Sequence, residues 1–331
     1  MPSAEIVHVV NYMPERVIKN AELMQASDGE QGSDDFFLGV EERRFASPDY
    51  SSVDLGAAAL KKLLDETGVA ASEIDLILCS CAFTDHLCMG IASAVGHRVG
   101  ATRAASINLD NGCTGFVTGL HMARSFVGSG IYKRVVLVTV VNLVSRLEDF
   151  QKKPQSYPLG DGASATLIVD GKASILSSIE RSFGGHYGLF SCSPEKREGA
   201  KNYGFWETEA PPLAFEFAPG VLTTLQTNAL SLVPNAVKAA LEEARLEPAQ
   251  VDCLITHQPN RVFLRKWRRR IGVPPERSHD TLHKYGNMFQ SSIPVTLADA
   301  LEQRKLQRGD VLALGTFSWG GDLVAAMTLR W

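Results

Sequence analysis

A cysteine stands at a junction between a strand-like and a helix-like segment. Cys113 follows the strand-like run 105–109 and precedes a small, apolar stretch that ends near Gly128. At a helix N-terminus, the helix dipole and the free N–H groups favour a thiolate and lower a cysteine pKa from its usual value of about 8.5. The thiolate is the nucleophilic form of cysteine. The sequence therefore predicts a nucleophile at Cys113.

A histidine and an asparagine stand at two similar junctions in the second half of the chain. His257 follows the strand-like run 253–256, and Asn287 precedes a helix-like stretch that starts near Ile293. A thiolate can attack a thioester, while an imidazole and an amide can donate hydrogen bonds to a second carbonyl on which negative charge develops. A lone cysteine or histidine is more often part of a packed core. The three together favour acyl-transfer chemistry.

The segments that carry these residues alternate between strand-like and helix-like patterns. Strand-like runs are expected at residues 74–79, 105–109, 135–141, 165–169, 251–256 and 311–314. Such alternation indicates a layered α/β fold. The segment from Phe183 to Phe217 has no clear periodicity and is too long for an ordinary connection, so we expect it to cap or line a substrate channel.

A helix-strand unit occurs twice in the sequence. Residues 59–77 resemble residues 236–254, and Asp75 matches Asp252 at an offset of 252 − 75 = 177. Chance similarity of two amphipathic units is the alternative. A genuine duplication predicts two halves packed about a pseudo-twofold axis, with equivalent strand-to-helix junctions near the centre.

The same offset relates two of the candidate catalytic residues. Adding 177 to position 113 gives position 290, close to Asn287. The duplication therefore predicts that Cys113 and Asn287 lie near each other. We expect one half at residues 1–171, with the cysteine, and another at residues 172–331, with the histidine and the asparagine.

Composition narrows the class of protein. The chain has 331 residues, 45% of them hydrophobic, and a formal net charge of −4, which gives no overall field for nucleic acid or an anionic membrane. The six cysteines form no CxxC pair, so we expect reduced thiols and no metal. The sequence has no charged leader with an apolar core, as in a signal peptide. It also has no apolar run of about 20 residues, the length needed to span a bilayer. We expect a soluble, cytoplasmic protein with neither nucleic acid nor a membrane as partner.

Five ordered motifs resemble the β-ketoacyl-acyl-carrier-protein synthase III family of the thiolase superfamily, over essentially the whole chain. They are Gly-Cys-Thr-Gly-Phe at 112–116, Gly-Asp-Gly-Ala at 160–163, His-Gln-Pro-Asn at 257–260, Gly-Asn at 286–287 followed by Ser-Ile-Pro at 292–294, and Phe-Ser-Trp-Gly at 317–320. The resemblance implies a five-layer αβαβα thiolase fold and a homodimer. It implies that Cys113 accepts the acyl group and that His257 and Asn287 bind the carbonyl of an extender thioester.

The resemblance also implies a two-step reaction, with no tightly bound cofactor and with acyl-CoA or acyl-phosphopantetheine as substrate. An acyl thioester first transfers to Cys113. A malonyl thioester then loses CO₂, and its enolate attacks the acyl-cysteine. Backbone N–H groups of Cys113 and Gly315 would form the oxyanion hole, typically worth about 3 kcal/mol per donor. Phe289 and Phe317 are expected to line the channel, whereas Asp161 is expected to be structural.

A cluster of cations follows His257. Apolar residues interleave with the cations at helical spacing, which predicts an amphipathic helix. In an acidic chain such a face suggests docking of an acidic acyl carrier protein or of the phosphates of coenzyme A, although a solvated helix face is the alternative. The cations are Arg261, Arg265, Lys266, Arg268, Arg269 and Arg270.

Two departures from the family pattern bear on the substrate. Residues 34–40 are shorter than the adenine-clamping run of members that start from acyl-CoA and have Phe36 where those members have Trp, so a carrier protein is the expected donor. Bulky residues, Met288 and Phe289, follow Asn287. The runs Gly-Asn-Met at 286–288 and His-Gln-Pro-Asn at 257–260 together resemble those of quinolone-signal condensing enzymes, which predicts a role in secondary metabolism.

Two other functions compete with condensation. An enzyme of the same fold could move the acyl group from Cys113 to an alcohol or an amine, without loss of CO₂. A non-catalytic partner subunit of a synthase is the second alternative, and the intact set of Cys113, His257 and Asn287 argues against it. A dehydrogenase is disfavoured because no GxGxxG motif follows a strand.

Overall fold

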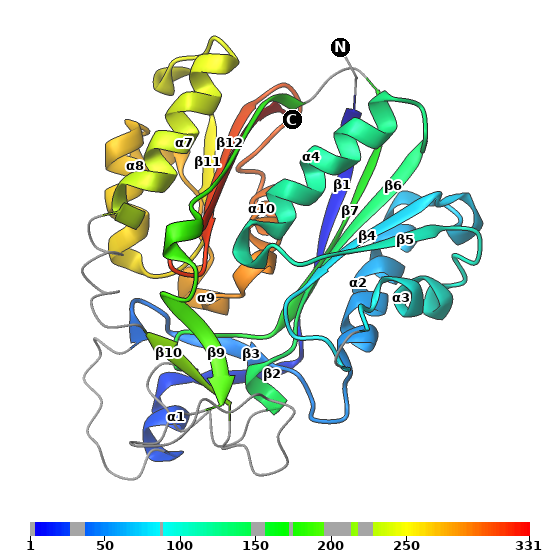
Figure 1. Ribbon diagram of the computed structural model, residues 1–331, viewed down its shortest axis with the longest axis horizontal. Helices are drawn as coiled ribbons and strands as arrows, with labels where there is room; N and C mark the ends of the chain where they lie inside the picture. Colours follow the sequence, from blue (N-terminus) through cyan, green and yellow to red (C-terminus); the bar gives the residue numbers. More distant parts are fainter. Residues whose placement is uncertain are drawn as a thin grey trace.

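Two large β-sheets and three helical layers make up the core of the molecule (Figure 1). The structure is a computed structural model that describes residues 4–26, 37–86, 89–146, 156–171, 175–194, 213–217 and 228–331. One sheet lies in each half of the chain, and helices cover both faces of each sheet. The predicted five-layer αβαβα arrangement is confirmed.

The first sheet has the strand order β1–β7–β6–β4–β5. Its strands are β1 (Ala4–Tyr12), β4 (Leu76–Cys81), β5 (Ala105–Leu109), β6 (Arg134–Val141) and β7 (Gly162–Asp170). β4 runs parallel to β5 and β6, whereas β7 runs antiparallel to β1 and β6. β4 and β6 are almost completely buried, as expected of apolar strands covered on both faces.

The second sheet repeats most of this order as β8–β13–β12–β11. Its strands are β8 (Ile175–Ser182), β11 (Cys253–Thr256), β12 (Val311–Ser318) and β13 (Leu323–Arg330). The carboxylate of Asp75 accepts the N–H of Arg134 at 2.9 Å, and the carboxylate of Asp252 accepts the N–H of Val311 at 2.9 Å. Both residues of the second pair lie 177 positions after those of the first, so the predicted duplication is confirmed.

The helices pack by layer (Figure 1). α4 and α10 lie between the sheets, α2 and α3 cover the outer face of the first sheet, and α7 and α8 cover the second. Side chains of α4, α10 and both sheets share one apolar core, where each buried large side chain contributes roughly 1.5–3 kcal/mol. The helices are α1 (Asn20–Ala26), α2 (Ser52–Thr67), α3 (Ala92–Val99), α4 (Gly115–Gly128), α7 (Leu230–Glu243), α8 (Arg261–Ile271), α9 (Leu282–Tyr285) and α10 (Ser292–Glu302).

Short elements complete the fold. β2 (Arg16–Lys19) pairs with β3 (Glu42–Phe45), and β9 (Phe190–Pro194) pairs with β10 (Leu213–Phe217). The hairpin of β9 and β10 lies in the segment for which sequence patterning gave no regular structure. Short 3₁₀ turns are η2 (Ala71–Glu73), η3 (Gly112–Thr114), η4 (Val144–Arg146), η6 (Gly184–His186), η8 (Pro248–Gln250), η9 (Pro275–Arg277) and η10 (Phe289–Ser291). Within the described ranges, no helix is long and apolar enough to cross a membrane.

Candidate active site

A cavity of about 200 Å³ lies among loops that come from both halves of the chain. Cys113, His257 and Asn287 all line it, so the structure brings together the three residues that the sequence singled out. Both expected channel residues, Phe289 and Phe317, line it as well. The other lining residues are Leu38, Pro158, Leu159, Phe190, Pro259, Asn260, Phe263 and Trp319. Most of this lining is apolar, as in small-molecule sites with a few convergent polar groups.

Strand β12 holds the turn that carries the cysteine. Thr316 Oγ1 donates to the carbonyl of Cys113 at 3.0 Å, and the N–H of Thr114 donates to Ser318 Oγ at 2.9 Å. Ser318 Oγ in turn donates to the carbonyl of Asn111 at 2.6 Å. Two hydroxyl side chains of the second half therefore fix the nucleophile turn of the first half.

The expected low pKa of the cysteine is wrong. Burial raises the pKa of the Cys113 thiol to about 12, and hydrogen bonds from the backbone N–H groups of Trp319 and Cys113 oppose this rise only in part. The side chain lies in the turn η3, ahead of α4, and is 8% exposed. Desolvation thus outweighs the helix N-terminus, and Cys113 carries a thiol rather than a thiolate at neutral pH.

Gly315, the second expected donor of the oxyanion hole, is a strand residue. Gly315 lies inside β12, paired with Thr256 on one side and with Ala326 on the other. Its carbonyl accepts the N–H of His257 at 2.9 Å. Because the N–H and C=O of a strand residue point to the same neighbouring strand, the Gly315 N–H also faces β11. The backbone N–H groups that reach the sulfur are those of Cys113 and Trp319.

His257 is held neutral. The ring is 3% exposed, and burial lowers its pKa to about 3, although a hydrogen bond to the backbone of Phe289 opposes this. The ring packs edge-on against Phe317 at 5.9 Å between centroids. Nδ1 is buried without a hydrogen-bond partner among the residues that the structure describes. An imidazole in this state remains neutral across physiological pH.

The backbone around Asn287 fixes the orientation of its side chain. The N–H of Asn287 donates to the carbonyl of Pro158 at 2.7 Å, and its Oδ1 accepts the N–H of Phe289 at 2.9 Å. The side-chain NH₂ therefore remains available to donate into the cavity. Phe289 contacts both polar residues through its backbone and has a left-handed φ of 44°, and such backbone conformations cluster at functional sites.

The predicted basic helix is α8, and its cations divide into two groups. Arg261 donates through its guanidinium to the carbonyl of Gly39 at 3.1 Å and through its N–H to the carbonyl of Leu38 at 2.9 Å. It thereby holds a loop at the edge of the cavity. Arg270 donates to the carbonyl of Leu230 at 2.5 Å. The four cations that line an open surface groove are Arg265, Lys266, Arg268 and Arg269.

The positions of Asp161, Phe37 and Trp319 bear on the remaining expectations from the sequence. Asp161 lies outside the cavity, and its carboxylate accepts backbone N–H groups from residues 46 and 143–145, which is a structural role. Residues 34–36, in the run that departs from the family's adenine clamp, fall outside the described ranges, whereas Phe37 is buried and stacked on Tyr157 at 5.3 Å. Trp319 was part of a motif, but no sequence signal pointed to its N–H.

Comparison with known proteins identifies the family of the chain. The model of 3-Oxoacyl-[acyl-carrier-protein (ACP)] synthase III matches residues 107–184, and the model of its C-terminal part matches residues 241–331. A β-ketoacyl-[acyl-carrier-protein] synthase III of Bacillus pumilus is 31% identical over 335 residues, which cover 99% of each chain. The chain belongs to this family. It is therefore a condensing enzyme of the acyltransferase type.

Solved structures agree on the fold. The 3-oxoacyl-(acyl carrier protein) synthase III of Pseudomonas aeruginosa PAO1 superimposes with a TM-score of 0.84 at 25% identity, covering 99% of this chain and 98% of that one. The priming β-ketosynthase of the R1128 polyketide pathway gives a TM-score of 0.85 at 23% identity, covering 99% and 96%. The similarity to the priming β-ketosynthase supports only the fold, because the identity is below 25%. The similarity to quinolone-signal condensing enzymes stays a prediction.

Proposed function

We propose that the enzyme transfers an acyl group from a thioester to Cys113 and then condenses it with a malonyl thioester, with loss of CO₂. The observation that carries this proposal is that Cys113, His257 and Asn287 line one cavity. In the first step the sulfur of Cys113 bonds to the acyl carbon, the donor C–S bond breaks, and the thiol proton leaves with the donor thiol. The N–H groups of Cys113 and Trp319, rather than those of Cys113 and Gly315, would stabilise the oxyanion.

The second step uses the two donors of the other half. The C–CO₂ bond of the malonyl thioester breaks, and its electrons form an enolate whose oxygen accepts hydrogen bonds from His257 and Asn287. The enolate carbon then bonds to the acyl carbon, and the thiolate of Cys113 leaves. A neutral imidazole suits this step because it can donate an N–H to the enolate without being charged itself, once the tautomer places the proton toward the cavity.

We infer further that the partners and the setting follow the family pattern. An acidic acyl carrier protein would dock on the cationic groove of α8, and we assign no tightly bound cofactor and no metal. A homodimer would form through β5, whose outer edge meets no other strand in the part of the chain that the structure describes. We keep the division into halves at 171/172, a cytoplasmic location and a role in secondary metabolism as proposals.

Intact mass spectrometry tests the first step. The protein is incubated with acyl-CoA and with acyl-carrier-protein donors, in parallel with the variant Cys113→Ala. We expect one acyl adduct on the wild type and none on the variant. Charge reversal at Arg265 and Arg269 should raise KM for the carrier donor more than for the CoA donor. A wild-type protein that accepts no donor would overturn the catalytic assignment in favour of a partner subunit.

Release of CO₂ tests the second step. The variant Asn287→Ala should still be acylated at Cys113, but condensation should fall by about 10²–10³-fold, because one donor to the enolate oxygen is lost. Equal loss of both steps would show that Asn287 acts on folding rather than on the extender carbonyl.

Acyl transfer to an alcohol or an amine is the second candidate. It is favoured by the buried Nδ1 of His257, which no described residue contacts by a hydrogen bond. In the neutral ring this nitrogen can be a proton acceptor, as a general base for a hydroxyl or amine requires. Formation of an ester or amide without CO₂ from the acylated enzyme would select this reaction.

A further inference from the structure

Arg43 is a buried cation that holds only neutral oxygens. Its side chain is 0% exposed, and no ion pair joins it to a carboxylate within the described ranges. Nη1 donates to the carbonyl of Ile18 at 3.2 Å and to Asn20 Oδ1 at 2.8 Å, and Nη2 donates to the carbonyl of Tyr157 at 2.7 Å. Burial lowers the pKa of Arg43 to about 10, so the group is still charged at neutral pH. Because a buried charge without an opposite charge is costly, the role of Arg43 should lie in the oxygens that it holds.

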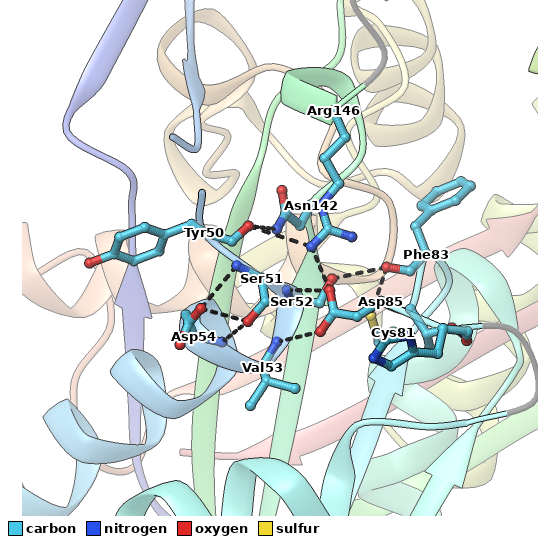
Figure 2. A network of polar contacts seen from close by, with 12 residues as sticks. Tyr50, Ser51, Ser52, Val53, Asp54, Cys81, Phe83, Asp85, Asn142 and Arg146 are labelled. Carbon is cyan, nitrogen blue, oxygen red and sulfur yellow. Dashed lines mark hydrogen bonds and ion pairs between the residues drawn. The ribbon is translucent and has the colours of Figure 1, made fainter. Parts of the chain in front are cut away.

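Arg146 offers a contrast (Figure 2). It forms an ion pair with Asp85, whose carboxylate also accepts the N–H groups of Ser52 at 2.7 Å and Val53 at 3.1 Å. Burial raises the pKa of Asp85, but the guanidinium and these N–H groups outweigh it and leave the pKa below its usual value. Arg146 is therefore balanced by an opposite charge and anchors the start of α2, whereas Arg43 has no such balance.

A short segment, residues 157–160, runs alongside Asn287. The carbonyl of Pro158 accepts the N–H of Asn287 at 2.7 Å, and the N–H of Gly160 donates to the carbonyl of Asn287 at 3.2 Å. The two backbones touch, since a Cβ atom at Gly160 would lie 2.4 Å from the carbonyl oxygen of Tyr285. Segment 157–160 therefore holds both main-chain polar groups of Asn287.

Arg43 connects that segment to the first half of the chain. Nη2 reaches the carbonyl of Tyr157, while Nη1 reaches oxygens at the end of β2 and the start of α1. The same guanidinium lies 5.5 Å from the ring centroid of Phe37, which is stacked on Tyr157. The residues that follow these two rings, Leu38 and Pro158, both line the cavity. One buried cation thus supports two segments of the cavity wall.

We propose that Arg43 is a positioning residue for Asn287: its guanidinium fixes residues 157–160, and these fix the asparagine whose side-chain amide donates to the enolate oxygen. The inference rests on the proposed function, because that amide acts only in the step that releases CO₂. None of the hydrogen bonds that Arg43 makes within the described ranges reaches the turn of Cys113. Loss of the guanidinium should therefore slow the second step of the reaction and leave the first step unchanged.

A double-mutant cycle with Asn287→Ala tests this role. Arg43→Met keeps an unbranched side chain but removes the guanidinium. Release of CO₂ from a malonyl thioester by the acylated enzyme should fall by about tenfold, since a small misplacement of a donor is sufficient for such a loss. Acylation of Cys113, measured by intact mass in single turnovers, should be unchanged. In the Asn287→Ala background the same substitution should cost less than about twofold further, because residues that act as one unit are not additive.

Arg146→Met is the matched control. It also removes a guanidinium with a structural role, but one that has no hydrogen bond to segment 157–160 among the described residues. The ratio of CO₂ release to acylation should therefore stay at the wild-type value. Arg43→Lys is the second test variant if Arg43→Met folds poorly. It keeps the charge but loses the planar fork that spans two oxygens, so the same loss of CO₂ release is expected in a weaker form.

Hydrogen exchange measures the same link without turnover. The amide of Asn287, bonded to Pro158 in the wild type, should exchange at least about tenfold faster in Arg43→Met, because a local opening becomes easier. Methyl methanethiosulfonate checks the turn of Cys113: the reagent transfers its S-methyl group to the thiolate, and methanesulfinate leaves. This labelling should proceed at the wild-type rate in the variant.

Two results would overturn the role of Arg43. One is an equal loss of acylation and CO₂ release in the Arg43 variants, and the other is a loss of CO₂ release that is as large in the Asn287→Ala background as in the wild type. A wild type that releases no CO₂ would instead reject the proposed function. Exchange then decides on Arg43 alone, since faster exchange at Asn287 keeps the positioning role and unchanged exchange rejects it. The two failures are therefore distinguishable.

Discussion

The turn before α4 and the turn before α10 occupy equivalent places in the two halves. η3 covers residues 112–114 and η10 covers residues 289–291, so both begin 177 positions apart, and each leads directly into its helix. The position that corresponds to Cys113 is Gln290. Cys113 lines the cavity, whereas Gln290 is 1% exposed and donates through Nε2 to the carbonyl of Val140 at 2.6 Å.

The adjoining strand ends differ in the same way. Ser80, in β4, corresponds to His257, after β11, again at an offset of 177. His257 lines the cavity, but Ser80 is packed so closely against α4 that a Cβ atom at Gly115 would lie 2.0 Å from its hydroxyl oxygen. The duplicated scaffold therefore supplies the junction twice, and the side chains beside it decide whether the junction opens on a cavity or is filled. The function of each junction therefore depends on the side chains beside it.

The largest expected difference between the two turns is in catalysis. Cys113→Ala should abolish acylation, by roughly 10⁴-fold or more, because the nucleophile is removed. Gln290→Ala should leave acylation within about threefold, since no step of the proposed reaction uses this residue. Intact mass and single-turnover kinetics on both variants check the comparison. Equal losses would mean that the packed turn supports catalysis as strongly as the open one.

The second-largest expected effect is on stability. It comes from His257, whose counterpart in the first half is Ser80. Burial lowers the pKa of His257 to about 3 from an unperturbed value near 6.5. Below pH 6.5 the unfolded state binds a proton that the folded state does not, so His257 makes the protein less stable as pH falls toward 3. The limiting slope is about 1.4 kcal/mol per pH unit.

Urea unfolding at pH 6.5 and pH 4.5 measures this effect. The free energy of unfolding of the wild type should fall by about 2.5 kcal/mol more than that of His257→Gln over this range. The subtraction removes the contribution of carboxylates common to both proteins. Parallel pH profiles for the two proteins would show that the ring is accessible to protons in the folded state.

Sequence patterns predicted the layered scaffold well, and they also predicted which polar residue lies near Cys113. β5 was predicted to the residue, and the offset of 177 correctly predicted that Cys113 lies near Asn287. Among the strands of the two large sheets, β1, β8 and β13 were not predicted. β13 is rich in Ala, Met and Leu, which favour helices, and it is a strand because β12 and β8 pair with it on both sides.

The electrostatics of the site could not be predicted in this way. The dipole argument for a low cysteine pKa considers only the local turn, whereas the pKa of Cys113 is set by burial among residues distant in sequence. The hydrogen bond from the Trp319 N–H to the Cys113 sulfur also depends on tertiary structure. Trp319 adopts a left-handed φ of 46° directly after β12, and no glycine or turn motif at this position announces that conformation.

A smaller effect is expected from the filled turn. Gln290→Ala should lower the free energy of unfolding by about 2 kcal/mol, because it removes a buried hydrogen bond to Val140 and leaves a void at a position that is 1% exposed. Urea denaturation measures it, with Gln307→Ala at an exposed position of the same chain as the control. A change below about 0.5 kcal/mol would mean that the turn relaxes around the missing side chain.

The smallest effect separates two threonines that occupy equivalent strand positions. Thr316 Oγ1 donates to the carbonyl of Cys113 at 3.0 Å, and its counterpart Thr139 donates through Oγ1 to the hydroxyl of Ser291 at 2.9 Å. Thr316→Val and Thr139→Val should each cost about 1 kcal/mol of unfolding free energy. Of the two variants, only Thr316→Val should also change the rate of methyl methanethiosulfonate labelling at Cys113, by about threefold in either direction, because Thr139 makes no hydrogen bond to the turn of the nucleophile. Equal labelling rates in both variants would show that Ser318 alone positions that turn.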